Sequence, residues 1–218
     1  DTVTTTAEVV ESIPAPEPVE LSVWELCLKG GFIMIPLALL SIICIYIFIE
    51  RYIVLRRANR EDASFMKRIK DYIHEGEIES AKNLCKKNGS PYARLILKGI
   101  SRIGRPMNDV LVAIENTGNL EIANLGKGLP WLATTAAGAP MLGFLGTVIG
   151  MVEAFFSLAS AGSAANIGVL AGGIYEALVT TVAGLVVGII ALFAYNYLVS
   201  RINGVMKLLE GKTMEFMD

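Results

Sequence analysis

Three long apolar runs divide this 218-residue chain. The first, GFIMIPLALLSIICIYIFI, covers residues 31–49, and two longer runs occupy residues 129–161 and 164–199. Because roughly 20 apolar residues cross a bilayer as a helix, the pattern predicts an all-α membrane protein with three spanning helices, at 23–50, 129–161 and 164–200. The last two exceed the usual length, since 36 helical residues reach about 54 Å, so both are expected to extend beyond the hydrocarbon into the cytoplasm.

The segments outside the runs are polar. Residues 51–128 have a helical period, with Ile78, Ala81, Leu84 and Cys85 on one face, and they predict a cytoplasmic helical region. Asn-Gly-Ser-Pro at 88–91 should end one helix, whereas the amphipathic stretch before residue 129 is expected to run directly into the second span. Residues 1–22, rich in Thr, Pro and acids, predict a disordered extracytoplasmic tail, and residues 201–218 a cytoplasmic C-terminal tail.

Composition and charge support the membrane class. The chain is 53% hydrophobic and 18% charged, with a mean hydropathy of +0.53. Glu153 and Glu176 are the only Asp, Glu, Lys, Arg or His between residues 129 and 200. A nucleic-acid-binding protein would need a stripe of basic residues, and the sequence does not indicate one. The three cysteines are scattered without a Cys-x-x-Cys spacing, and the single histidine lies in a charged stretch, so we expect no disulfide framework, metal site or cofactor.

The basic residues predict the topology. Fifteen of the nineteen Lys and Arg residues lie between the first and second spans, and only Lys29 precedes the first apolar run at 31–49. The positive-inside rule therefore predicts an N-terminus on the outer side, with the long loop and the C-terminus in the cytoplasm. An aromatic belt is consistent with this, since Trp24 falls at the outer interface and Trp131, Tyr195 and Tyr197 fall at the inner one.

The third span has one small, polar face. When the sequence is projected at 100° per residue, small and polar residues gather within about 140° of Glu176, and bulky residues occupy the opposite arc. Glu176 lies roughly 16 Å into this span, near the middle of the bilayer. A carboxylate at that depth is costly and usually lines a cavity or an ion pathway. The small face comprises Gly173, Ala177, Thr180, Thr181, Ala183, Gly184 and Gly188.

The second span repeats this division around Thr147. Its Gly and Ala residues share one side with Thr147, and its Leu, Val and Phe residues occupy the other. Such faces allow close helix packing, and we assign that role to Gly143, Gly146, Gly150, Gly173, Gly184 and Gly188. The acid favours a second role, in which several copies turn these faces toward a common axis and the first span faces lipid. The predicted pore-lining residues are Thr147, Glu176, Thr180 and Thr181.

Both spans carry a recognisable motif. Residues 139–155, APMLGFLGTVIGMVEAF, resemble the second-span signature of the ExbB/TolQ/MotA proton-channel family. Residues 172–196, GGIYEALVTTVAGLVVGIIALFAYN, resemble its third-span signature, G-I-x-E-A-L-x-x-T-x-x-G-L. The chain departs from the family where Ile189-Ile190-Ala191 replaces an Ile-Pro-Ala pattern, so no proline kink is expected there. Three spans favour the ExbB or TolQ type over the four-span MotA type.

The resemblance implies a motor subunit of the bacterial inner membrane. In that family, five copies form a ring around two single-span helices of an ExbD-like partner. An acid on the partner carries protons beside pore-lining threonines, which by position are Thr147 and Thr181 here, with Glu176 in the same pore. The proton motive force then energises a TonB-like protein that opens outer-membrane transporters. An acidic extracytoplasmic tail leans slightly to the ExbB type over TolQ, the envelope-integrity type.

Two other functional classes compete with this interpretation. An intramembrane enzyme would need paired Asp, a Ser–His dyad or an HExxH zinc site, and the spans contain neither Asp nor His, so we do not expect an enzyme. A non-conducting membrane scaffold would use the small faces for packing alone, and it would tolerate replacement of Glu176 by Gln.

Overall fold

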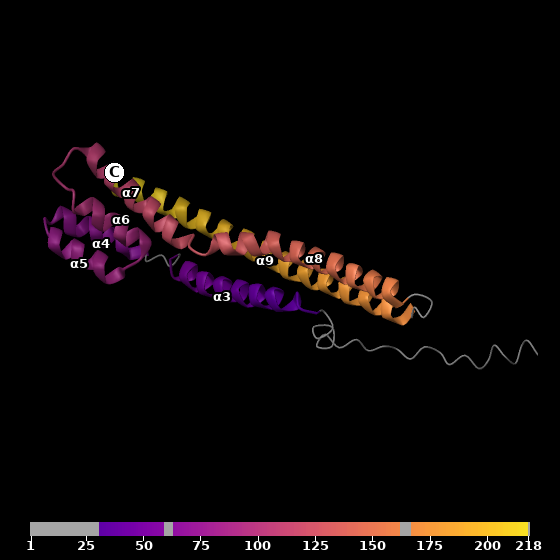
Figure 1. Cartoon of the computed structure of the whole chain (residues 1–218). Helices are drawn as coiled ribbons and strands as arrows, with labels where there is room; N and C mark the ends of the chain where they lie inside the picture. The colour runs from indigo at the N-terminus through magenta and orange to yellow at the C-terminus, as the bar shows by residue number, and fades with distance from the viewer. Residues whose placement is uncertain (1–30, 59–62, 162–166, 218) are drawn as a thin grey trace, which may run out of the picture.

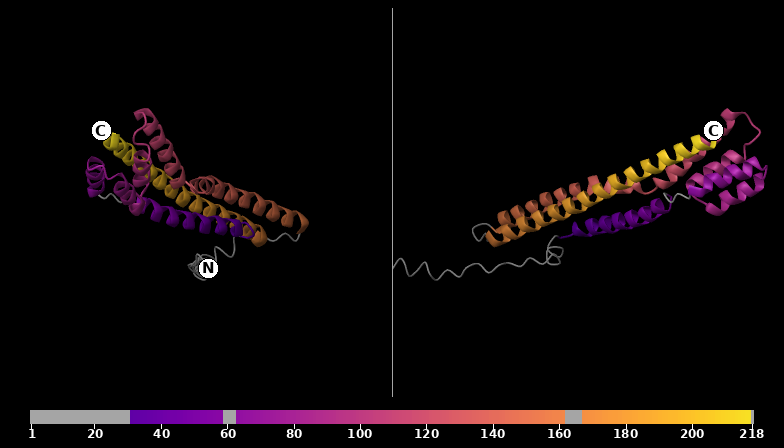
Figure 2. Two further views of the ribbon diagram at one scale, coloured as in Figure 1. Left: turned by 90° about the vertical axis from the view of Figure 1, so that its left-hand side faces the viewer. Right: turned by 180° about the vertical axis from the view of Figure 1, so that it is seen from behind.

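The computed structural model describes residues 31–58, 63–161 and 167–217, and the regular elements within them are all helices (Figure 1). Long helices run side by side along one axis, and shorter helices gather at one end of them (Figures 1 and 2). The predicted tail at 1–22, the aromatic residue Trp24 and the link at 162–166 lie outside the described residues.

Three helices are long and apolar enough to cross a membrane. They are α3 (Met34–Ala58), α8 (Leu129–Ala161) and α9 (Ile167–Met217). α8 and α9 lie antiparallel along most of the length of α8, and α3 lies against both of them (Figure 1). For the described residues, the prediction of an all-helical architecture with three candidate membrane-spanning helices is therefore confirmed.

The helical region between the first two spans contains α4 (Ala63–His74), α5 (Ile78–Asn88), α6 (Pro91–Ile100) and α7 (Met107–Leu125). As predicted, α5 ends at 88–91: Gly89 is left-handed with φ 63°, and the Ser90 side chain accepts a hydrogen bond from the Ala93 N–H. Ile69, Ile96 and other apolar side chains from these helices form a core at the end of the long helices.

The junction between α7 and α8 differs from the prediction of one continuous helix. α7 ends at Leu125, and Gly128 takes φ 86° immediately before α8 begins at Leu129. A left-handed residue cannot continue a right-handed helix, and glycine adopts this conformation at little cost. The chain therefore changes direction here, and the apolar period alone could not show the break.

The third span continues far beyond its predicted end. α9 runs 51 residues to Met217, so the stretch predicted as a tail is helical almost throughout. Leu198, Ile202, Val205 and Leu209 recur every three or four residues, and all are buried in the core formed with the helical region. This apolar stripe gives the end of α9 tertiary contacts that a free tail would lack.

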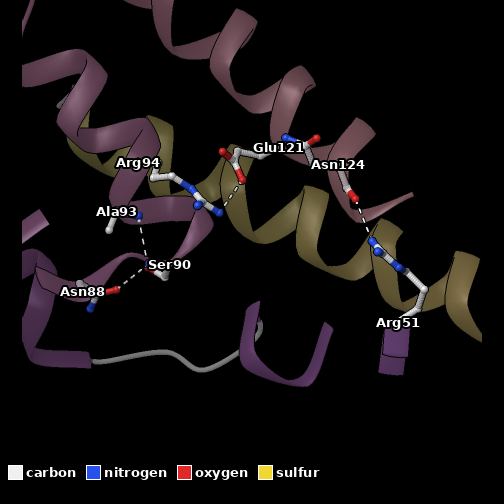
Figure 3. A network of polar contacts seen from close by, with 7 residues as sticks. All are labelled: Arg51, Asn88, Ser90, Ala93, Arg94, Glu121 and Asn124. Atoms are coloured by element: carbon white, nitrogen blue, oxygen red, sulfur yellow. Dashed lines mark hydrogen bonds and ion pairs between the residues drawn. The ribbon is translucent and has the colours of Figure 1, made fainter. Parts of the chain in front are cut away.

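Polar contacts join the helical region to the end of α3 (Figure 3). Arg51 of α3 donates a hydrogen bond of 3.0 Å to the Asn124 carbonyl of α7. On α6, the Arg94 guanidinium lies 2.8 Å from a Glu121 carboxylate oxygen of α7. These contacts fix α7 against both the first spanning helix and its neighbour in the helical region.

Candidate functional site

The small faces of α8 and α9 pack against each other within one chain. A Cβ built on Gly184 would lie 2.5 Å from the Ala139 carbonyl oxygen and 2.9 Å from the Gly143 Cα. A Cβ on Gly188 would lie 2.6 Å from the Pro140 ring. Such distances leave no room for a methyl group, so the two backbones approach as closely as small residues allow.

The same contact continues toward the α8–α9 connection. A Cβ on Gly150 would lie 3.0 Å from the Ala177 Cβ, and one on Gly173 would lie 2.7 Å from the Ala154 Cβ. Gly146 faces Thr180 so closely that a Cβ would overlap its side chain. All six glycines to which we assigned a packing role therefore lie at this interface.

The threonines take different positions around the interface. Thr181 donates a hydrogen bond of 3.0 Å to the Gly143 carbonyl, which links α9 to α8 directly. Thr180 is 3% exposed and donates 2.8 Å to the Ala177 carbonyl of its own helix. Thr147 is half-buried and donates 2.6 Å to the Phe144 carbonyl of its own helix. Thr180 thus lies inside the two-helix contact, whereas Thr147 and Thr181 keep part of their surface exposed.

Glu176 faces the beginning of the first spanning helix. Its carboxylate lies directly over the Cα of Gly31, so closely that a Cβ at that position would overlap it. Gly31 has φ 62° and its carbonyl accepts a hydrogen bond from the Met34 N–H, at the turn that opens α3. Glu176 is half-buried about 14 Å into α9 from Ile167, and Thr180 follows one turn later on the same face.

The bulky faces of the spans point outward, which changes the arrangement expected from the sequence. We expected the small faces to line an axis, but within one chain they cover each other. In the most apolar stretches of α3, α8 and α9, only 11%, 17% and 33% of the residues are buried within one chain. The exposed side chains on α8 and α9 include Phe144, Val148, Val152, Phe155, Leu178, Val182, Leu185 and Ile189.

Two features of the site could not be predicted from the sequence. The contact between Glu176 and Gly31 joins residues far apart in the chain, and a helix projection cannot assign a partner to a face. The backbone carbonyls of Ala139 and Gly143 also form contacts between α8 and α9, and residue type does not indicate what a backbone carbonyl contacts. Among the residues that the structure describes, no group of three His, Cys, Asp or Glu side chains could hold a metal ion.

Comparisons of the sequence with known proteins identify its family. Residues 87–211 match the model of the MotA/TolQ/ExbB proton channel family. The ExbB-like biopolymer transport protein 1 of Synechocystis sp. is 33% identical over 176 residues, 79% of this chain and 69% of its own. The ExbB homolog of Methanothermobacter thermautotrophicus is 31% identical over 183 residues, 84% of this chain and 64% of its own. The Tol-Pal system protein TolQ of Haemophilus influenzae is 42% identical over 87 residues, 40% of this chain and 38% of its own.

Fold and site together define a multi-pass helical membrane protein in which two long spans pack through glycines beside a carboxylate and hydroxyl groups. The family match covers more than half of the chain, from the helical region through α8 and most of α9. The chain belongs to the MotA/TolQ/ExbB proton channel family, a family of channel proteins rather than a known class of enzymes.

Proposed function

We propose that this chain is a proton-channel subunit of an ExbB-like inner-membrane motor, which uses the proton motive force to energise TonB-dependent outer-membrane transport. The observation that carries the proposal is the Glu176 carboxylate within the third span, about one helical turn from Thr180 and Thr181. Thr181 also donates the hydrogen bond that links α9 to α8. An ionisable group at this depth is costly, and such groups usually line an ion pathway or a water-filled cavity. The proposed proton pathway comprises Glu176, Thr181 and Thr147, with Thr180 buried beside them.

The exposed apolar faces support assembly with further helices. Most of the surface of α8 and α9 is uncovered within one chain, so lipid or other subunits must cover it. We propose a homo-oligomeric ring, of five copies by family resemblance, with an ExbD-like single-span dimer in the pore and a TonB-like transducer as the next partner. In this ring, Glu176 would meet the pore between the α3 turn and the α8–α9 pair.

The proposed location is the bacterial inner membrane. The fifteen basic residues between the first two spans support a cytoplasmic helical region by the positive-inside rule, with the N-terminus on the periplasmic side. α9 carries the chain back to the same side, since Arg201, Lys207 and Lys212 lie near its end.

A TolQ-like envelope-integrity motor is the second candidate function. The 42% identity to the Haemophilus influenzae TolQ, over 87 residues, favours it by a specific match. Both candidates share the proton pathway and differ in the protein that receives the force. Complementation separates them: the chain is expected to restore TonB-dependent uptake in cells lacking ExbB, and not detergent resistance in cells lacking TolQ.

The proton pathway is tested by two substitutions with a matched control. Glu176→Gln and Thr181→Val are each expected to reduce proton-dependent transport at least tenfold while native mass spectrometry still shows the oligomer. Glu153→Gln removes the other acid of the spans, which is exposed on α8 at about the level of the contact between Ala154 and Gly173, and is expected to leave transport near normal. Normal transport in Glu176→Gln would instead favour the non-conducting scaffold.

A further inference from the structure

A pocket of about 630 Å³ lies between the end of α3 and the middle of α9. Its lining includes two arginines, Arg56 and Arg201, and two tyrosines, Tyr52 and Tyr197, together with small and aliphatic side chains. Among the described residues that line it there is no Asp or Glu. This lining therefore combines two positive charges with phenol groups.

The aromatic side holds one guanidinium in place. The Tyr52 and Tyr197 rings stack with centroids 6.3 Å apart, and Phe48 lies 6.2 Å from each. The Arg201 guanidinium lies 5.4 Å from the Tyr197 ring centroid, and its Nε donates 3.1 Å to the Tyr197 hydroxyl. This contact uses Nε and one face of the guanidinium, while the two terminal nitrogens remain as donors.

Neither arginine is neutralised within the part of the chain that the structure describes. No ion pair is formed there by Arg56 or Arg201, whereas neighbouring Arg51 is bound to Glu50 at 2.6 Å and to the Asn124 carbonyl. Two guanidinium groups that share a pocket repel each other, and an anion between them would relieve that repulsion. Arginine also matches phosphate oxygens through two parallel N–H donors.

The pocket lies where the apolar runs of both helices end. In α3 the run ends at Ile49, three residues before Tyr52, and in α9 it ends at Val199, two residues before Arg201. In a bilayer this level coincides with the headgroups, where tyrosines are enriched and basic pockets between spanning helices bind anionic lipids. A free anion would have no reason to prefer this level, whereas a lipid phosphate is held there by its acyl chains.

We propose that this pocket binds the phosphate of an anionic phospholipid in the leaflet on the side of the helical region. Arg56 and Arg201 contact the phosphate, and the Tyr52 and Tyr197 hydroxyls contact the glycerol backbone. The bound lipid fastens α3 to α9 at the level where the two helices leave the membrane. This inference requires only that α3 and α9 span a bilayer, and it does not depend on proton conduction.

The test compares two double variants of the full chain in nanodiscs. Arg56→Gln/Arg201→Gln removes the pocket charges, and Arg102→Gln/Arg105→Gln removes two charges from the turn between α6 and α7, which does not line the pocket. Each protein is reconstituted with phosphatidylglycerol in phosphatidylcholine, transferred to detergent, and examined by native mass spectrometry for retained lipid. Parallel samples contain phosphatidylcholine alone, or phosphatidylcholine with inorganic phosphate.

The expected result is retention of phosphatidylglycerol by the unmodified chain and the control, with a loss of about tenfold in the pocket variant. Phosphatidylcholine should not be retained, and inorganic phosphate should not displace phosphatidylglycerol at millimolar concentration. Equal retention by the pocket variant, an equal loss in the control, or displacement by inorganic phosphate would each overturn the proposal. Transport activity takes no part in the readout, so failure of the proton pathway leaves this result unaffected.

Discussion

The closest approach of the α8 and α9 backbones gives the sharpest test of the fold. Gly184→Ala places a methyl group 2.5 Å from the Ala139 carbonyl oxygen, 2.9 Å from the Gly143 Cα and 3.1 Å from the Gly143 nitrogen. All three neighbours are backbone atoms, so a rotamer change cannot make room and the helices must move apart. Inserting a methyl group into a packed contact costs about 1–3 kcal/mol.

Gly172→Ala is the matched control on the same helix. A Cβ on Gly172 meets nothing within 4 Å, so this variant changes only helix propensity, which favours Ala over Gly by up to about 1 kcal/mol. The same gain applies to Gly184→Ala and cancels in the comparison. We therefore expect Gly184→Ala to be less stable than Gly172→Ala by about 1–3 kcal/mol.

The assay is reversible unfolding in mixed micelles with increasing dodecyl sulfate, followed by far-ultraviolet circular dichroism. Equal free energies of unfolding for the two variants would refute the close packing of α8 on α9 within one chain. If the small faces instead turned toward a common axis, the two variants would have equal free energies of unfolding. In that arrangement Gly184→Ala would also lose the single-span partner from the purified complex. The pair of variants thus decides which surface covers the glycines.

Three further predictions concern the helical region. Burial raises the pKa of the Cys85 thiol to about 11 from an ordinary 9.0, so the unfolded state releases its proton first and stability should fall as the pH rises from about 9 to 11, measured by chemical unfolding at fixed pH. Gly99→Val should release the end of α9 from α6, because even a Cβ there lies 2.6 Å from the Phe216 ring, and hydrogen exchange of residues 205–217 should increase at least tenfold. Glu121→Gln removes the ion pair with the half-exposed Arg94 and should lower the free energy of unfolding by about 1 kcal/mol or less in low salt, and by less in high salt.

Each of these has a control in the same region. Cys85→Ala should remove most of the decline above pH 9, and an unchanged profile would contradict the role of the thiol. Gly118→Val sits beside Leu95 at an ordinary 3.6 Å and should leave exchange at the end of α9 unchanged. Glu79→Gln breaks the pair between the exposed Glu79 carboxylate and Lys82 and should not change unfolding measurably, so an equal effect at Glu79 and Glu121 would argue against a specific contribution from Arg94.

Hydrophobic length and period predicted the spanning helices well, because a bilayer imposes a minimum apolar run that residue type records directly. The start of α8 at Leu129 coincides with the start of the second apolar run, and Asn-Gly-Ser-Pro marks the turn between α5 and α6. The break at Gly128 was missed, since an apolar period does not report backbone dihedrals. The helical end of α9 was missed because basic residues interrupt its stripe of buried aliphatic side chains.

The candidate site was predicted in part, for a related reason. A helix projection correctly separated small from bulky faces, yet it contains no information on what each face contacts. The projection therefore could not distinguish small faces that turn toward a common axis from small faces of α8 and α9 that cover each other, as they do within one chain. Glu176 illustrates the same limit: its depth follows from its position in the run, but its contact with Gly31 depends on how α3 packs.

The continuity of α9 has a mechanical consequence. Within its 51 residues there is no proline, and Glu176 is joined to Met217 by about 62 Å of unbroken hydrogen-bonded backbone. A continuous helix of this kind resists compression along its axis, so a displacement at the carboxylate would be carried toward the far end. Phe216, wedged against Gly99, would pass that motion to α6 outside the bilayer, which makes the C-terminal end of the chain a place to observe events in the middle of the membrane.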